Sequence, residues 1–179
     1  MNIVRILLLI AACFFLLVSI VGAAVLTWRN FNDASGISDA YSKGVEQLKK
    51  AGLSDEAAKK ALDEQLNAPG KRQMPTAAAL NTAGIVTAAN IFLMLVVLIV
   101  MFLRNAKIAL LAAGALILFT IVMIFVNPQY ETGMAGPASS RYIAWLLGIP
   151  ILIGALLAMG AAALRNRAAP LSSSTATTL

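Results

Sequence analysis

The sequence predicts an all-α integral membrane protein with four transmembrane helices and a helical hairpin in the long loop between the first and the second. The 179 residues are 60% apolar and only 12% charged, with a mean hydropathy of +0.83. A soluble domain is closer to half apolar and one quarter charged. Four runs contain no charged residue and are long enough for a helix to cross about 30 Å of hydrocarbon. They are residues 6–28, 76–103, 108–126 and 142–164.

None of these runs alternates apolar and polar residues as a membrane strand does, so each is predicted to be a helix. We expect a first transmembrane helix within residues 1–28 and three further ones at about 80–103, 108–126 and 142–164, within a membrane segment 76–167.

The first run is predicted to be an uncleaved signal anchor. The apolar part of a cleaved signal peptide spans about 7 to 15 residues, whereas this run continues over 6–28. Cys13 resembles the cysteine of a lipoprotein processing box, but apolar residues follow it, so we reject that interpretation. As the single cysteine it forms no intramolecular disulfide, and within lipid it is expected to be inert.

Residues 29–75 change abruptly to polar composition and are predicted to form a water-exposed loop. Residues 30–36 contain Asn, Asp, Ser and Gly, which favour turns, and are expected to be a connector. Two short helices are predicted after it. The first covers about 38–51, is capped by Ser38 and ends at Gly52; the second covers about 54–67 and is capped by Ser54.

Apolar residues at helical spacing give the two loop helices a narrow docking face. It consists of Tyr41, Val45, Leu48, Leu53, Ala57 and Ala61, with Ala58 and Leu62 beside it. So small a hairpin buries little area by itself, and it needs outside support. That support is the protein's own spans, a partner protein or the membrane surface, and the sequence does not choose among them. Residues 168–179, rich in Ser, Thr and Ala, are expected to be a disordered tail.

We expect both termini in the cytoplasm and loop 29–75 outside it, in a bacterial inner (plasma) membrane, as the Ala- and Gly-rich spans suggest. This orientation puts bases without acids on the inner side, in agreement with the positive-inside rule. These bases are Arg5, Arg104, Lys107, Arg165 and Arg167. The eight Lys and Arg residues of loop 29–75 favour the opposite orientation, although seven acids alternate with them.

The chain contains no histidine, which removes His-ligated haem and most transition-metal sites. The four runs lack ionisable groups apart from the phenol of Tyr142 and the thiol of Cys13, which disfavours proton relays. We therefore predict no catalytic residue, no cofactor and no metal site. The net charge of +6 comes with no nucleic-acid motif, so we expect membrane lipids and no nucleic acid as partners.

Small residues four apart, together with one amide, are the predicted helix-packing positions. They are Gly84, Ala88 and Asn90 in the second run, Ala109 and Ala113 in the third, and Gly154 and Ala158 in the fourth. The side-chain amide of Asn90 is expected to form a hydrogen bond to another helix. The alternative is a ligand pocket between Asn90, Thr120 and Pro150.

These observations favour a non-catalytic membrane scaffold or accessory subunit of a larger membrane complex, which docks through its spans and its polar helical loop. Its partner is expected to be another membrane protein or further copies of this chain. The alternative is a small protein that handles lipids or small molecules, by binding, transport or membrane enzymology, with a pocket near Asn90. The sequence favours a protein that is not an enzyme without deciding the matter.

Overall fold

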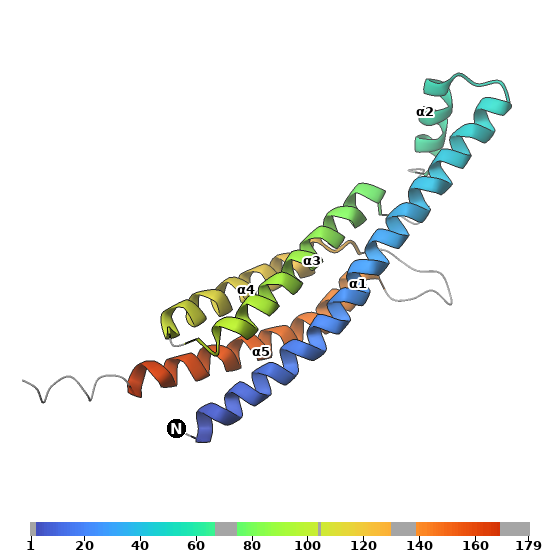
Figure 1. Ribbon diagram of the computed structural model, residues 1–179. Coiled ribbons are helices and arrows are strands. Elements are labelled where there is room, and N and C mark those ends of the chain that lie inside the picture. Colours follow the sequence, from blue (N-terminus) through green and yellow to red (C-terminus); the bar gives the residue numbers. More distant parts are fainter. Residues whose placement is uncertain (1–2, 67–74, 104, 130–138, 169–179) are drawn as a thin grey trace, which may run out of the picture.

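The computed structural model describes residues 3–66, 75–103, 105–129 and 139–168 (Figure 1). Within these residues all regular structure is helical, which confirms the predicted all-α class. The five helices are α1 (Ile3–Lys50), α2 (Asp55–Leu66), α3 (Ala77–Val100), α4 (Ala106–Val126) and α5 (Ser140–Ala168). Among them, α1, α3, α4 and α5 are long and apolar enough to cross a membrane, in agreement with the four predicted spans. The predicted tail 168–179 lies, apart from its first residue, outside the described residues.

The four long helices form an antiparallel bundle. Helix α1 packs against α3 and α5, and α4 packs against the same two helices, so α1 and α4 stand diagonally opposite each other. The start of α1, the α3–α4 turn and the end of α5 lie together at one end, which we call the terminal end (Figure 1). The opposite end, from which α1 projects, is called the arm end.

Close helix contact in the bundle depends on glycine at a few positions. A Cβ added to Gly154 of α5 would lie 3.0 Å from the side chain of Leu16 on α1. A Cβ on Gly84 of α3 would lie equally close to the ring of Phe31. Leu16 is fully buried as a result. Small residues therefore let the backbones approach, as is usual where lipid supplies no hydrophobic force between helices.

Helix α1 does not end at Trp28, and this corrects the predicted loop. The expected connector 30–36 is helical, and the expected separate helix 38–51 is the last part of α1. Asn30 and Ala34 continue the buried face of the span, and Arg29 pairs with Asp33 one turn later at 3.4 Å. An asparagine breaks a helix when its amide competes for its own backbone. Here the Asn30 amide bonds to other segments, so the competition does not arise.

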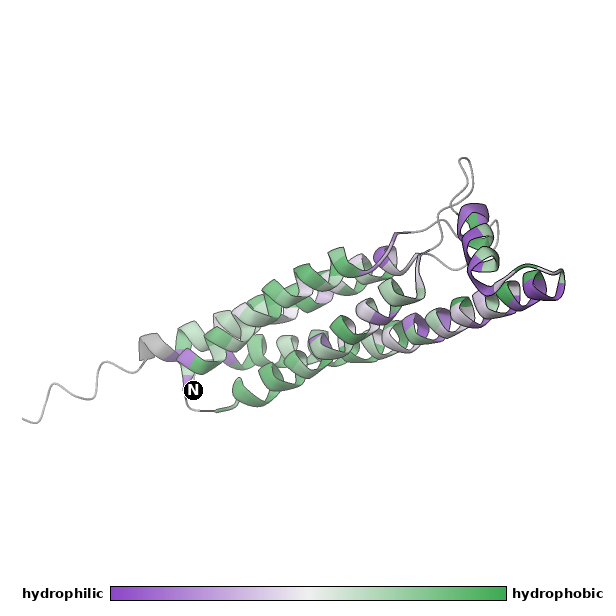
Figure 2. Cartoon of the chain, turned by 90° about the horizontal axis from the view of Figure 1, so that it is seen from above, coloured by the Kyte–Doolittle hydropathy of each residue, from purple (hydrophilic) through white to green (hydrophobic). Residues whose placement is uncertain are grey.

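The part of α1 beyond Ala34, together with α2, forms a polar arm that projects from the bundle, and we call it the arm (Figure 2). Helix α1 ends in a Schellman motif, in which Gly52 N–H bonds to Lys49 O at 3.0 Å and Leu53 N–H to Leu48 O at 3.2 Å. Gly52 adopts φ of +98°, the left-handed region that glycine enters without a Cβ clash. Ser54 then accepts from Ala57 N–H and caps α2.

A pair of glycine substitutions distinguishes a continuous α1 from a helix–connector–helix arrangement. Gly36 lies inside α1 with open space where a Cβ would be, so Gly36→Ala should stabilise the arm by about 0.5–1 kcal/mol. Gly52→Ala should destabilise the hairpin by about 1–2 kcal/mol because of its positive φ. Amide hydrogen exchange of the arm in detergent measures both. Unchanged or faster exchange in Gly36→Ala would contradict a continuous helix.

Candidate functional site

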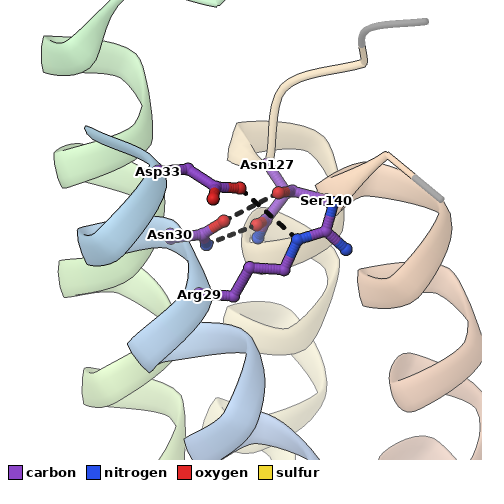
Figure 3. Close-up of polar contacts among 5 residues, drawn as sticks. All are labelled: Arg29, Asn30, Asp33, Asn127 and Ser140. Carbon is purple, nitrogen blue, oxygen red and sulfur yellow. Dashed lines mark hydrogen bonds and ion pairs between the residues drawn. The ribbon is translucent and has the colours of Figure 1, made fainter. Parts of the chain in front are cut away.

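The most distinctive feature of the bundle is a set of buried polar side chains at its arm end, which we call the polar cluster. It consists of four fully buried residues, which are Asn30 of α1, Thr87 of α3, Asn127 at the end of α4 and Ser140 of α5. Figure 3 shows Asn30, Asn127 and Ser140. Burying an amide or hydroxyl is unfavourable unless it is hydrogen-bonded. The partners of these groups therefore decide what the cluster does.

The cluster is a directed chain of hydrogen bonds. Ser140 Oγ donates to Asn30 Oδ1 at 2.7 Å, and Asn30 Nδ2 donates to Asn127 Oδ1 at 2.9 Å (Figure 3). Asn127 Nδ2 in turn donates to Met123 O at 2.7 Å, and more weakly to Thr87 Oγ1 at 3.5 Å. Side chains separated by 97 and 110 positions are thus joined. The bond between Asn30 and Asn127 crosses the bundle diagonal, where the backbones of α1 and α4 do not meet.

Charged groups surround the cluster on its water side. Arg141 Nε donates to Asn127 O at 3.0 Å, and Arg141 Nη2 donates to Phe125 O at 3.0 Å. The Arg141 guanidinium therefore binds the last carbonyls of α4, where its positive charge interacts favourably with the negative end of the helix dipole. Arg29 and Asp33 form their ion pair beside Asn30 (Figure 3). Arg141 thus joins the start of α5 to the end of α4, and the Arg29–Asp33 pair lies within α1.

A second buried polar contact lies deeper in the bundle. Asn90 Nδ2 on α3 lies 3.4 Å from Thr120 Oγ1 and 3.2 Å from Met123 Sδ, both on α4. The single Thr120 hydroxyl hydrogen goes to Leu116 O at 2.7 Å, so its lone pair can accept from Asn90. The amide thus bonds helix to helix, which is the first of the two interpretations given to Asn90 above.

Most predicted packing positions lie in helix contacts. Gly84, Asn90, Ala109, Ala113, Gly154 and Ala158 are buried. Ala88 is exposed, so it lies outside the buried contacts between the described helices. In α3 the buried face passes through Gly84, Thr87 and Asn90, and Ala88 points away from it. A spacing of four alone does not fix which face of a helix is buried.

Asn30, Asn127 and Ser140 were not among the predicted site residues, because Asn and Ser next to the end of an apolar run are typical of turns. The sequence of α1 does contain a pattern that indicates the buried position of Asn30. Its buried residues Ala23, Leu26, Asn30 and Ala34 continue with steps of three and four, the period of one helix face. Continuing the period of the first run past Trp28 would have placed Asn30 on the buried side.

The predicted docking face of the arm lies largely between α1 and α2. Val45 and Ala58 are buried, and a Cβ on Gly44 would lie 3.0 Å from Leu62. Tyr41, Leu48, Leu53 and Ala61 are half-buried, whereas Ala57 is exposed and its neighbour Ala58 takes the inner position. Among the described elements α2 contacts α1 alone. The apolar residues of the hairpin therefore face each other, and the outer surface of the arm is polar.

Ion pairs and one hydroxyl bond also close the hairpin. Asp55 pairs with Lys49 at 3.0 Å and with Lys59 at 2.8 Å. Hydrogen bonds from Lys59 and Lys49 hold the pKa of the Asp55 carboxyl below its ordinary value. Tyr41 Oη donates to Asp63 Oδ1 at 3.0 Å. All these groups are solvated, so each contributes little, and the closed hairpin depends on several of them together.

The fold and the polar cluster define a class: an all-helical integral membrane protein with four candidate spans, joined by buried neutral polar groups and carrying a polar arm. No protein-family model, curated protein or solved structure matches this chain. Within the described ranges, no group of three His, Cys, Asp or Glu side chains is placed to hold a metal ion. The function must therefore be argued from the chain itself.

Substitution of Asn30 tests whether the polar cluster stabilises the bundle. Asn30→Ala removes the donor to Asn127 Oδ1 and one acceptor of Ser140 Oγ, so it should destabilise the protein by about 2 kcal/mol. Asn81→Ala removes an exposed amide near the same end and should change stability by less than about 0.5 kcal/mol. Unfolding in mixed micelles with increasing sodium dodecyl sulfate measures both. Equal losses would mean that the cluster contributes nothing specific.

The ion pairs of Asp55 predict a pH-dependent hairpin. Because its pKa is lowered in the closed hairpin, Asp55 contributes stability at neutral pH, and this contribution is lost as the pH falls below about 4 and through the lowered pKa. Spin labels on Ser42→Cys and Gln65→Cys, in a Cys13→Ala background, should move apart on acidification.

Asp55→Asn should remove much of this response and widen the distance distribution at neutral pH. The matched control is Asp39→Asn, since Asp39 makes no ion pair with any described residue. A distance between the two labels that changes neither with pH nor in Asp55→Asn would contradict this account of the hairpin.

Proposed function

We propose that this protein is a non-catalytic scaffold or accessory subunit of a larger membrane complex, which it joins through its spans and its polar arm. The observation that carries the proposal is the 48-residue helix α1, which continues without a break from the membrane bundle into the arm. The bundle beneath it is held together by neutral groups that are bonded to one another. The arm is thus one part of the molecule that offers surface to another molecule.

The geometry of the arm suits a docking element. From Arg29 to Lys50 the helix extends about 33 Å at 1.5 Å per residue, which is close to the thickness of the hydrocarbon core. The hairpin is therefore held well away from the lipid. Since α2 contacts no described helix other than α1, its outer faces are available.

The outer surface of the arm is charged in both signs. Asp39, Lys43 and Glu46 are exposed along α1, and Lys60 and Glu64 are exposed along α2. Interspersed charges of both signs are typical of a surface that fixes the orientation of a partner and selects against wrong ones. This supports a protein partner with a complementary polar surface above the membrane.

The spans offer a second surface. Phe14, Leu17, Val21 and Val25 are exposed on one side of α1, where they face lipid or the span of a neighbouring protein. A span can associate laterally through such a face without any change in the bundle. A subunit that joins a complex through its spans and positions an arm above it would use both surfaces.

We place the protein in a bacterial inner membrane with both termini cytoplasmic and the arm outside. Trp28, Tyr142 and Trp145 are exposed at the arm end and form an aromatic belt where an interface is expected. The terminal end carries bases and, in sequence, no acid within residues 1–12, 97–112 or 155–179. In residues 29–75, by contrast, seven acids alternate with eight bases, and this difference in net charge supports the proposed orientation.

A crosslinking experiment tests the proposed role. A photo-crosslinking residue at Lys43 should capture one partner in stoichiometric amount from native membranes, because Lys43 lies exposed on the arm. The same residue at Lys107, exposed at the opposite end, should not capture it. Deleting residues 38–66 should abolish the complex and leave the bundle folded. A protein that stays a lone monomer in mild detergent, with no crosslink from either position, would overturn the proposal.

A further inference from the structure

Helix α5 consists of two parts that are held in the bundle by different forces. Near its start, Ser140 donates to Asn30 of α1, and Arg141 donates to the last carbonyls of α4. Pro150 follows about three turns after the helix begins, and residues 150–164 contain no polar side chain. We call residues 151–165 the terminal segment. Polar bonds thus join the first part of α5 to its neighbours, whereas the terminal segment is held mainly by apolar packing.

The polar bonds between helices end at about the depth of Pro150. Asn90 of α3 bonds to Thr120 of α4, and a Cβ on Gly148 of α5 would lie 3.6 Å from Thr120 Cγ2. Gly148 therefore lies beside this contact, two residues before the proline. The buried residues of the terminal segment are apolar or glycine, and they are Ile151, Gly154, Ala155, Ala158, Ala161 and Ala162.

One hydrogen bond joins the terminal segment to another helix, among the side chains that the structure describes. Arg165 Nη2, at the far end of the segment, donates to Met101 O of the α3–α4 turn at 3.2 Å. Arg165 Nη1 is buried without a partner, which is unfavourable in the same position. The two effects are of similar size and opposite sign, so Arg165 contributes little net free energy to holding the segment in place.

Moving the two parts of α5 away from the bundle has different consequences. Movement of the first part would remove the donors to Asn30 Oδ1 and to the last carbonyls of α4, which is unfavourable in hydrocarbon. Movement of the terminal segment separates apolar surfaces, and lipid tails are as apolar as the side chains they replace. Pro150 has no N–H for Leu146 O, and proline is the usual site of a bend within a helix.

We propose that the terminal segment moves away from the bundle about a hinge at Pro150 and thereby opens the terminal half of the bundle sideways to the lipid. The polar cluster keeps the arm end closed during this movement. The surface that becomes exposed is apolar and includes Ala12 and Leu16 of α1 and Ala113 of α4, which pack in one cluster with the segment. The movement does not depend on the proposed role as a subunit.

Two buried alanines of α5 provide the test, since Ala144 precedes the hinge and Ala158 follows it. Each is replaced by cysteine in the full chain with Cys13→Ala, in lipid nanodiscs. The rate of reaction with the membrane-permeant reagent N-ethylmaleimide is followed by mass spectrometry. Because local opening must expose either thiol, Ala158→Cys should react about ten-fold faster or more. Depth alone would favour Ala144→Cys, which lies one turn from Ser140, whereas Ala158 lies two turns from Arg165.

Substitution of the proline tests the hinge. Pro150→Ala restores an N–H for Leu146 O, so it should slow the reaction of Ala158→Cys about five-fold and that of Ala144→Cys by less than about two-fold. Ile149→Ala, at the exposed neighbouring position, is the control and should change either rate by less than about two-fold.

The comparison of the two cysteines retains Pro150, so it decides the proposal even if Pro150→Ala does not fold. Equal reaction rates at positions 144 and 158, or a faster reaction at 144, would overturn the movement of the terminal segment. A faster reaction at 158 that Pro150→Ala leaves unchanged, or that Ile149→Ala slows equally, would overturn the hinge.

Discussion

The bond between Asn30 and Asn127 is the contact on which the arrangement of the arm end depends. Helices α1 and α4 are diagonal neighbours whose backbones do not meet, so side chains must connect them. In a hydrocarbon environment an unpartnered amide is costly, and apolar contacts between helices gain little over contacts with lipid. Polar bonding therefore specifies the register there. Ser140 extends the chain of bonds to α5, and Thr87 connects it to α3.

The same contact explains why α1 passes through a segment rich in turn-forming residues. Asn30 would compete with the helix if its amide were free to bond its own backbone. The bonds to Asn127 and Ser140 occupy that amide, and Phe31 on the next position packs over Gly84. Tertiary contacts thus decide the local conformation. Helix α1 continues into the arm because contacts in the bundle fix its conformation at Asn30 and Phe31.

The four spans could be predicted from sequence because their signal is one of length and hydrophobicity, which each run carries by itself. The turn between α1 and α2 could also be predicted, since Gly52 and Ser54 act through their own backbone and their nearest neighbours. The polar cluster could not be predicted from sequence. Asn30 and Asn127 are 97 positions apart, and nothing local to either shows that they meet. Of the packing residues, Asn90 could be recognised because an amide inside an apolar run is conspicuous, whereas a small residue such as Ala88 does not show from sequence which face of its helix is buried.

Because α1 is uninterrupted, it also fixes the direction in which the hairpin points relative to the bundle. Each residue of α1 turns the chain by about 100°, so the direction in which the hairpin points is set by the number of residues between Asn30 and Gly52. Inserting or removing a single residue in that interval would swing α2 to another side of the bundle. Changes of seven residues, close to two full turns, would lengthen or shorten the arm and nearly preserve its heading. The height of the hairpin above the membrane and the side it faces are therefore coupled through one count of residues.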